Sequence, residues 1–416
     1  MFKYFVTFFM ISAGFGACSK IAVPANSESS AVVIYGGVSS LVVQDMEATS
    51  DGGFIFSGHS GTGPSTGDLA FMLKTDANGK QQWLKTYGGS QTNGFQKARQ
   101  TSDGGFIAVG STCSFGNGPK DGDYYPDGYM VKTDANGNMT WQKTYGGIYF
   151  DTLYDVKEMP DHGFVTVGRL KVMNAYFQSY IYQLYIIRSD PSGNIKWENG
   201  YFNSVSYTSG QSIDISPNGD IIASGLAVKS TLLIDQNTLF PCMVCVNANT
   251  GIQKGTSLIF NAFTNSGLAI VKSVSDGYIL AADNIHDSSS IPNLIKTDFS
   301  LNVKWEKQYS HGFLIAGLNS AVSGGFNLCG TFVGFKNRCA LFSFDVSGSL
   351  ISSVEFSNST LNDVKFYASQ PTTINVFPTG NGYTVGAALS NTNTITNNRF
   401  ALFFSDHNGK ITDHVK

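Results

Sequence analysis

Short runs of alternating apolar and polar residues fill the chain between turn signals rich in glycine, aspartate and asparagine. In one stretch four such runs follow each other, at residues 95–100, 105–112, 129–133 and 139–145. Alternation with a period of two is typical of β-strands that have one buried face. The words DGG and DANG between the runs favour tight hairpins, because glycine adopts positive φ without strain and Asp or Asn tolerates it. The pattern therefore predicts antiparallel strands in groups of four.

The group of four strands is a repeat unit. Residues 35–86 and 87–144 align almost word for word, each carrying YGG, SDGGFI, KTDANG and W-x-K-T in that order. Weaker copies follow, so that seven units begin near residues 35, 87, 145, 201, 258, 309 and 356. All four tryptophans stand seven residues after the aspartate of the KTD-type turn; they are Trp83, Trp141, Trp197 and Trp305. A chance alignment would not place every tryptophan in one slot.

Four strands in a unit of about 50 residues, repeated seven times, predict an all-β fold: a seven-bladed β-propeller of four-stranded antiparallel blades over residues 31–416. Each tryptophan begins an outer strand, where we expect it to pack on the neighbouring blade. Residues 31–35 occupy the slot of an outer strand but have no three strands before them. We therefore expect them to pair with the last blade and close the ring, a place for which residues 410–415 compete.

The composition agrees with this fold and limits the function. Of 416 residues, 46 are glycine, 13% are aromatic and only 14% are charged, which is unfavourable for a helical or a βαβ fold. Lys and Arg number 27 against 30 Asp and Glu, for a net charge of −3. That balance argues against a nucleic-acid groove. We expect a monomer with no nucleic-acid partner.

The first residues indicate export. Residues 1–17 carry one charge, Lys3, followed by an uncharged and mostly apolar run. That run is too short to span a bilayer but suits a signal peptide. Gly16 and Ala17 directly before Cys18 resemble the lipobox of bacterial lipoproteins, in which the cysteine is lipidated and becomes the first residue of the mature chain. The alternative is an ordinary secretory signal with an incidental cysteine.

The lipobox resemblance implies where the protein is localised in the cell. It makes residues 1–17 a signal peptide and Cys18 the lipidated residue, with residues 18–30 as a flexible tether. The membrane is then a partner through the N-terminal lipid. Ser19 after the cysteine implies transfer to the outer membrane, on its periplasmic or its surface side.

The repeated words resemble a family. DGGF and KTDANG-W are similar to the words of uncharacterised secreted β-propeller lipoproteins of Bacteroidota, and residues 76–83 resemble more distantly the tryptophan-docking repeat of quinoprotein-like propellers. The resemblance covers residues 31–416 and implies a fold and an address, not a ligand. Quinoprotein dehydrogenases usually have eight blades and an adjacent cysteine pair, which this sequence lacks, so no quinone cofactor is implied.

The variable loops are the candidate binding face. In a propeller the connections between second and third strands share one face with the links between blades, and here they differ in length from unit to unit, while the other turns stay short. Two of these loops, at 113–128 and 169–181, carry aromatics that suit a sugar ring or a protein hot spot. The candidate ligand-binding residues are Tyr124, Tyr125, Tyr176, Phe177 and Tyr180. Aromatics that fold their own loop down onto the blade are the alternative.

Candidate chemistry elsewhere is sparse. Asp121, Asp123 and Asp127 resemble the start of a calcium loop, but no glutamate closes it, so a solvated acidic loop is favoured over a metal site. We expect no cofactor, with calcium as the one alternative. Cys242-x-x-Cys245 lies in a strand, where residues three apart face opposite sides, so we expect buried thiols.

These observations favour a membrane-anchored envelope lipoprotein that acts as a non-catalytic binding or scaffold propeller, with a glycan or an envelope protein as ligand. The alternative is a carbohydrate-active or quinoprotein-like enzyme whose acids are spread over several blades. Inward-pointing carboxylates with a raised pKa at the centre would favour the enzyme. An aromatic-lined surface would favour a binder, and a large exposed apolar patch a scaffold.

The lipid anchor is directly testable. We expect Cys18→Ala to leave the protein soluble in the periplasm or medium, because the tether provides no second anchor. Fractionation followed by a high-salt wash of the membranes measures this. A variant that stays in the washed membranes would contradict the lipoprotein interpretation.

Overall fold

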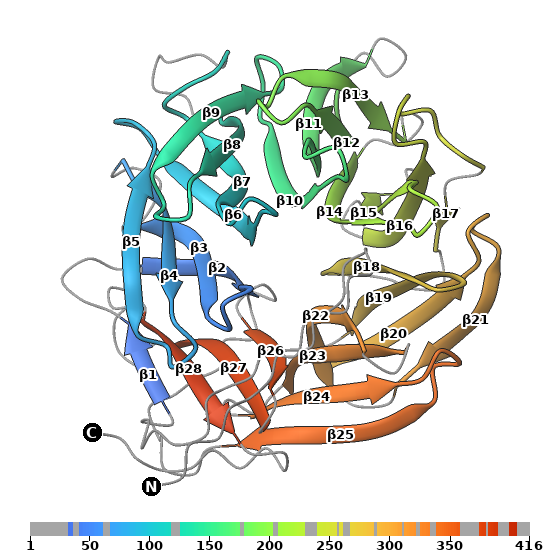
Figure 1. Ribbon diagram of the computed structural model, residues 1–416. Helices are drawn as coiled ribbons and strands as arrows, with labels where there is room; N and C mark the ends of the chain where they lie inside the picture. The colour runs from blue at the N-terminus through green and yellow to red at the C-terminus, as the bar shows by residue number, and fades with distance from the viewer. Residues whose placement is uncertain are drawn as a thin grey trace, which may run out of the picture.

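The computed structural model is an all-β propeller whose four-stranded antiparallel blades stand around a common axis (Figure 1). In the part of the chain that the structure describes, no helix is long and apolar enough to cross a membrane. The described residues are 32–35, 41–60, 67–117, 125–174, 179–202, 207–228, 239–255, 258–260, 267–286, 289–309, 312–321, 325–332, 338–357, 374–379, 382–389 and 399–405.

The strands follow the repeat units in order. Five four-stranded sheets run β2-β3-β4-β5, β6-β7-β8-β9, β18-β19-β20-β21, β22-β23-β24-β25 and β1-β28-β27-β26, and an eight-stranded sheet contains β10 to β17. The bounds are β1 Val32–Tyr35, β2 Leu41–Ala48, β3 Phe54–Ser60, β4 Leu69–Thr75, β5 Gln81–Tyr87, β6 Asn93–Gln100, β7 Phe106–Thr112, β8 Asp127–Thr133, β9 Met139–Tyr145, β10 Thr152–Glu158, β11 Phe164–Asn174, β12 Ser179–Ser189, β13 Ile195–Tyr201, β14 Tyr207–Ile215, β15 Ile221–Val228, β16 Leu239–Val246, β17 Leu258–Ile259, β18 Ala269–Val274, β19 Gly277–His286, β20 Ser289–Thr297, β21 Val303–Gln308, β22 Phe313–Ser320, β23 Phe326–Phe332, β24 Arg338–Phe344, β25 Leu350–Ser357, β26 Ile374–Thr379, β27 Gly382–Leu389 and β28 Arg399–Ser405.

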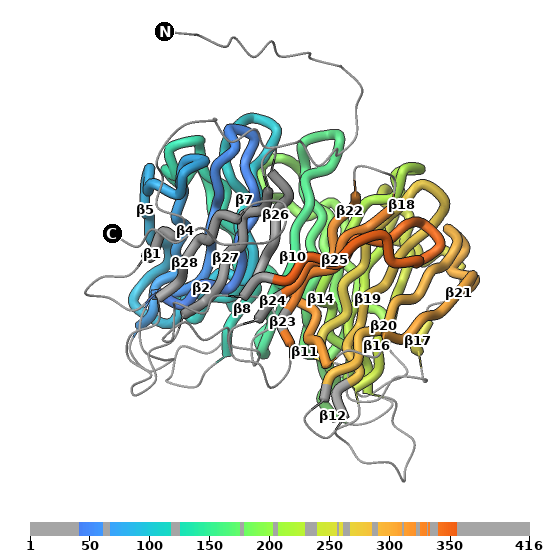
Figure 2. The backbone as a smooth tube through the Cα atoms, turned by 90° about the horizontal axis from the view of Figure 1, so that it is seen from below, coloured from blue at the N-terminus to red at the C-terminus, as the bar shows by residue number. Residues whose placement is uncertain are grey.

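The four strands predicted for unit two are confirmed as β6, β7, β8 and β9. The first strand of each unit lies nearest the axis and the fourth lies outermost (Figure 1). Because the strands alternate in direction, the first-to-second and third-to-fourth turns share one side of the ring, which we call the turn face. The second-to-third connections and the links between units share the other side, the loop face. Figure 2 shows the ring from the side, with the strands running between the two faces.

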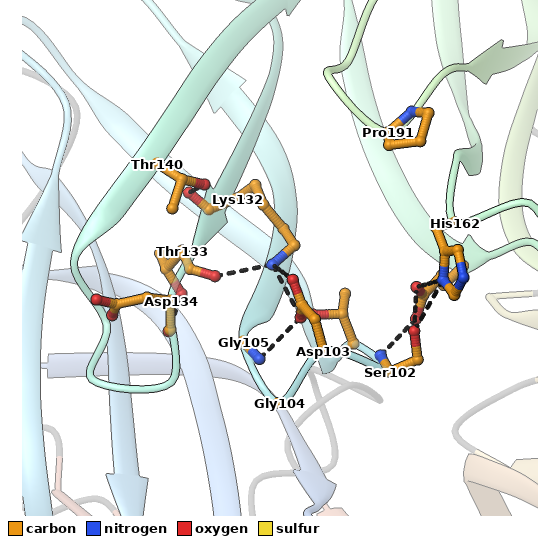
Figure 3. A network of polar contacts seen from close by, with 12 residues as sticks. Ser102, Asp103, Gly104, Gly105, Lys132, Thr133, Asp134, Thr140, His162 and Pro191 are labelled. Atoms are coloured by element: carbon orange, nitrogen blue, oxygen red, sulfur yellow. Dashed lines mark hydrogen bonds and ion pairs between the residues drawn. The ribbon is translucent and has the colours of Figure 1, made fainter.

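A partly buried ion pair joins the two turns of one blade (Figure 3). Lys132 Nζ donates to Asp103 Oδ2 at 2.8 Å and to the Thr133 carbonyl at 2.9 Å, and the Gly105 amide donates to Asp103 Oδ1 at 2.9 Å. Partial burial would raise the pKa of Asp103, but these bonds outweigh it and lower the pKa to about 2. The SDGG motif therefore supplies the aspartate of this ion pair, and the KTD motif supplies its lysine. It recurs as Asp51 with Lys74, Asp161 with Arg188 and Asp276 with Lys296.

Neighbouring blades are joined through the outer strands. Trp141 Nε1 donates to the Pro191 carbonyl at 3.2 Å, and Tyr145 Oη donates to the Gly193 carbonyl at 2.7 Å, so β9 is held on the next unit's turn. Gly193 has a φ of 78°, and a Cβ there would stand 2.9 Å from the Trp141 ring, so only glycine fits. The predicted packing of tryptophan on the next blade is thus confirmed. The same pair of bonds joins Trp83 and Tyr87 to Ala135 and Gly137, and Trp197 and Tyr201 to Ala248 and Gly251.

The two ends of the described chain meet in one sheet. β1 pairs antiparallel with β28, from Val32 opposite Phe403 to Tyr35 opposite Phe400. β28 also pairs with β27, so β1 takes the outer place of that sheet. The prediction that this segment completes the last blade is confirmed for residues 32–35, whereas residues 31 and 410–415 lie outside the described residues.

Two connections predicted as loops are largely strand. Residues 169–181 were expected to form a loop, but β11 and β12 pair from Phe164 opposite Ser189 to Asn174 opposite Ser179. Likewise residues 283–293, the second-to-third connection of unit five and one of the segments predicted as a variable loop, belong mostly to the β19–β20 hairpin. The extended β12 also pairs with β14 in parallel at Tyr182 and Tyr207, which joins units three and four into one sheet. These paired segments extend the strands to the loop face.

Apolar clusters fill the space between sheets, and the two cysteines of β16 illustrate their two sides. Cys242 packs in the cluster of units three and four, with Val165 and Leu184, whereas Cys245 packs in the next cluster, with Tyr278. Both are buried free thiols, as expected, and burial raises the pKa of each.

Ring closure predicts a specific loss of stability. A chain beginning at Gly36 lacks β1, so β28 loses the hydrogen bonds that it makes with β1 and becomes an edge strand. We expect the free energy of unfolding to fall by about 3 kcal/mol or more, at roughly 1 kcal/mol for each lost bond. Urea unfolding measures it. The control is a chain beginning at Ala31, which keeps β1; equal stability of the two chains would refute the role of β1.

Candidate binding surface and central cavity

An aromatic and basic surface lies at the loop-face end of units three and four. It combines the link before β10 with the extended β11–β12 hairpin and the start of β14. We call it the aromatic surface. It consists of Ile148, Tyr149, Phe150, Arg169, Lys171, Met173, Tyr180, Tyr182 and Tyr207.

The rings of the aromatic surface contact each other and two cations. Tyr149 and Tyr180 stand edge to face, 4.7 Å between centroids, and Tyr180 Oη donates to Tyr149 Oη at 3.1 Å. Lys171 Nζ lies 5.0 Å from the Tyr180 ring centroid, within the range of a cation–π contact. Deeper in, Arg169 lies 4.9 Å from the Tyr182 ring and donates to Tyr207 Oη at 3.2 Å. The side chains are therefore fixed relative to one another.

Part of the aromatic surface is open to solvent. Tyr180 is 45% exposed, and Ile148 and Met173 are each 55% exposed. Beneath them Asp151 accepts from the Lys171 and Gly147 amides, at 2.9 and 2.7 Å, which anchors the link to β11. Burial raises the pKa of Asp151 to about 6. Exposed apolar side chains on a fixed polar frame are typical of a recognition surface.

The predicted site residues divide between described and undescribed parts of the chain. Tyr180 lies on the loop face, in β12, where we expected a ligand to bind. Tyr125, half-buried before β8, acts with Tyr180 to raise the pKa of Tyr149, chiefly through the Tyr180 hydrogen bond. Tyr124, Tyr176 and Phe177 lie outside the described residues.

The acidic candidates give no metal site among the described residues. Asp127 opens β8 opposite Thr112 and is only 1% exposed, with Gly116 packed against it. Asp121 and Asp123 lie outside the described residues. No group of three or more His, Cys, Asp or Glu side chains gathers in a metal-binding arrangement within the part that the structure describes.

A second candidate site lies on the propeller axis. A cavity of about 420 Å³ is lined by the innermost strands β2, β6, β10, β14, β18 and β22. This volume is in the range of small-molecule sites. Four acids and four bases line it: Asp45, Glu47, Asp155 and Asp214, with Lys97, Arg99, Lys157 and Lys272.

A β-bulge recurs in the strands that line the cavity. The register shifts between Val43 and Asp45 in β2, between Phe95 and Lys97 in β6, and between Leu153 and Asp155 in β10. β14 and β22 shift at the equivalent place. A bulge puts two residues opposite one and turns the following side chains. The first residue after each of these bulges lines the cavity.

The charges of the cavity pair across blades. Arg99 bridges two units, with Nη1 2.7 Å from Glu47 Oε1 and Nη2 3.0 Å from Asp155 Oδ1. The other oxygen of Asp155 accepts from the Ile213 amide of β14 at 3.0 Å. Lys97 Nζ lies 3.7 Å from Asp45 Oδ1. These contacts link the inner strands of units one to four.

The same charges separate the pKa values of the acids. Burial raises the pKa of Asp45 to about 7, although Lys97 opposes the shift. Burial also disfavours ionised Glu47 and Asp155, but Arg99 and Lys97 outweigh it and hold both pKa values below their ordinary range. Lys157 and Lys272 likewise outweigh burial at Asp214 and lower its pKa, so the cavity holds one carboxyl that takes up a proton near neutrality beside three that stay ionised.

The cavity was missed in the sequence, although a signal was present. Charged residues stand at alternate positions just before the SDGG-type turns, as in Asp45-x-Glu47, Lys97-x-Arg99 and Asp155-x-Lys157. Alternate residues of a strand share a face, and in the innermost strand one face must point to the axis. Superposing the first strands of the units would have revealed the ring of charge.

Comparison with known proteins gives structural likeness without a family. No protein-family model matches the chain, and no curated protein matches it. A protein of unknown function from Bacteroides caccae matches with 14% identity and a TM-score of 0.39, over 65% of this chain and 82% of that one. Another from Dyadobacter fermentans matches with 10% identity and a TM-score of 0.46, over 89% and 97%. Periplasmic gluconolactonase of Pseudomonas aeruginosa matches with 12% identity and a TM-score of 0.43, over 80% and 92%.

The raised pKa of Asp45 predicts a pH-dependent stability. The folded-state pKa of about 7 exceeds the ordinary 3.8, so the stability it contributes is full below pH ~4 and is lost as the pH rises through 7. Asp45→Asn cannot ionise, so from pH 4 to pH 8 we expect it to gain about 2–4 kcal/mol relative to the wild type, measured by urea unfolding.

The control for Asp45 is a turn carboxylate whose pKa shifts the other way. Hydrogen bonds from Asn138 lower the pKa of Asp134. Its contribution is present above the ordinary pKa and is lost as the pH falls, so Asp134→Asn should lose stability relative to the wild type as the pH rises. A constant difference for Asp45→Asn between pH 4 and pH 8 would contradict the assignment.

Proposed function

We propose that this protein is a non-catalytic binding propeller of seven blades that captures a glycan on its loop face. The observation that carries the proposal is the aromatic surface, in which exposed Tyr180 is fixed by Tyr149 and Lys171. Tyrosine faces stack on the apolar faces of sugar rings, and their hydroxyls exchange hydrogen bonds with sugar hydroxyls. Seven repeat units in the sequence support the number of blades.

The mixture of side chains favours a glycan over a scaffold partner. Two cations, Arg169 and Lys171, stand among the rings, and tyrosine hydroxyls interrupt the apolar atoms. A scaffold interface would need a larger and more uniformly apolar patch. The two cations further favour a glycan that carries negative charge.

The address of the protein belongs to the same proposal. A lipid on Cys18 and a tether over residues 18–30 would hold the ring near the outer membrane, where envelope and environmental glycans are met. The support is the lipobox-like sequence Phe15-Gly16-Ala17-Cys18 behind an apolar signal.

A second candidate function has an observation of its own. Asp45, with its raised pKa, and ionised Glu47 face the cavity from the same strand, the combination of acid and carboxylate that glycoside hydrolysis uses. It favours the enzyme as the alternative to binding. Hydrolysis of a glycoside by the wild type but not by Asp45→Asn would select it.

Binding on the loop face is tested by removing two rings. A glycan array probed with the soluble chain from Ser19 onward identifies the ligand, and titration then gives its affinity. We expect Tyr149→Ala with Tyr180→Ala to weaken binding at least about tenfold, because both stacking faces are lost.

Two controls accompany the double variant. Tyr149→Phe with Tyr180→Phe keeps both rings and should bind within about threefold of the wild type. Ile351→Ala removes a side chain of similar exposure, 59%, on the outer strand β25 and should change nothing. Undiminished binding by the double alanine variant, folded normally, would move the site away from this surface.

A further inference from the structure

Two lysines of the central cavity share a single carboxylate. Lys157 Nζ of β10 lies 3.3 Å from Asp214 Oδ1, and Lys272 Nζ of β18 lies 3.3 Å from Asp214 Oδ2. The lysine side chains are only 22% and 23% exposed, and that of Asp214 is 10% exposed. Two positive charges against one negative leave one positive charge in excess at this wall of the cavity.

The other acids of the cavity are engaged elsewhere. Glu47 and Asp155 both hold Arg99, and Asp45 lies by Lys97. Asp214 is shared with the backbone as well, because its Oδ2 also accepts from the Ser273 amide at 2.8 Å. Among the described residues, Asp214 is the one carboxylate that forms an ion pair with either lysine, and Asp155 acts on Lys157 only from a greater distance. A partly buried ammonium that shares its carboxylate with a second one is incompletely compensated, and a further anion would compensate it.

The wall next to the two lysines carries no charge. β22 contributes Gly317, Asn319 and Ser320 to the described lining, and β14 adds Ser212, which is 6% exposed. Amide and hydroxyl groups of this kind exchange hydrogen bonds with the hydroxyls of a ligand.

We propose that the cavity binds a small hydroxyl-rich carboxylate, of the sugar-acid class, with its carboxylate between Lys157 and Lys272. A single carboxylate matches the single excess charge, whereas a phosphate near neutral pH carries more charge than this wall balances. The cavity of about 420 Å³ suits one such molecule. This site lies among the innermost strands, apart from the aromatic surface, and does not depend on the proposed function.

The site predicts coupling between binding and protonation. Burial, together with Arg99 of β6 and Lys272 of β18, lowers the pKa of Lys157 to about 8, against the opposing effect of Asp214 and Asp155. A bound carboxylate favours the charged ammonium and so raises this pKa. Binding near pH 8 should therefore take up protons, and affinity should fall as the pH rises further. Asp45 and Glu47 on β2 face the same cavity, but Asp45 ionises near pH 7, below this window.

Calorimetric titration of the full chain with sodium D-glucuronate tests the proposal, with D-glucose as the neutral probe. At pH 8 we expect glucuronate to bind at least about tenfold more tightly than glucose. Repeating the titration in two buffers of different ionisation enthalpy measures the proton uptake. Lys272→Gln should weaken glucuronate at least about tenfold while leaving the Lys157–Asp214 pair intact.

The matched control is Lys196→Gln. Lys196 and Arg188 also share one carboxylate, Asp161, but Lys196 is 45% exposed and lies outside the cavity. It should leave the affinity for glucuronate unchanged. Equal binding of glucose, equal loss in the two variants, or no binding of glucuronate tighter than about 10 mM would overturn the proposal. Binding without proton uptake by the wild type would overturn it as well, and this readout needs no variant.

Discussion

The structure depends on a contact between an outer strand and the next unit's turn, which β5, β9 and β13 all make. A tryptophan and a tyrosine, such as Trp141 and Tyr145, donate to two carbonyls of one tight turn, and the glycine of that turn admits the indole ring. A single hydrogen bond of this kind contributes only about 1 kcal/mol. Because the contact recurs between successive units, these weak bonds together fix the spacing of neighbouring blades. The cavity and the aromatic surface are built on blades held at that spacing.

With the blades held from outside, the innermost strands are free to carry charge. A lone buried carboxylate such as Asp155 would be unfavourable, but here Arg99 and the Ile213 amide of another unit satisfy it. The bulges aim these side chains at the axis and so concentrate the charge in one cavity. The loop face differs, because the aromatic surface is built on strands that extend beyond the common frame.

The sequence predicts the repeated strands and turns well, because the same motifs recur in each unit. The strands of unit two and the pairing of residues 31–35 with the last blade followed from turn chemistry and from the spacing of tryptophans. Features that occur in one unit only, or that join two units, are harder to predict from the sequence. The Arg99–Asp155 contact joins residues of two units, which no local pattern reveals. The segment 169–181 was expected as a loop because variable length was read as irregularity, yet Lys171 opposite Tyr182 continues a regular ladder.

The pairing of β1 with β28 makes the ring circular in a topological sense. The first and last described strands lie side by side in one sheet, so the two ends of the described chain are neighbours in space. Completion of this sheet must wait until the last strand is available, because β1 pairs with the strand most distant from it in the sequence. The same geometry suits circular permutation, in which the two ends are joined and the chain is opened at a link between two other units. Such a permutation would preserve the described sheets and change only which sheet combines the two ends of the chain.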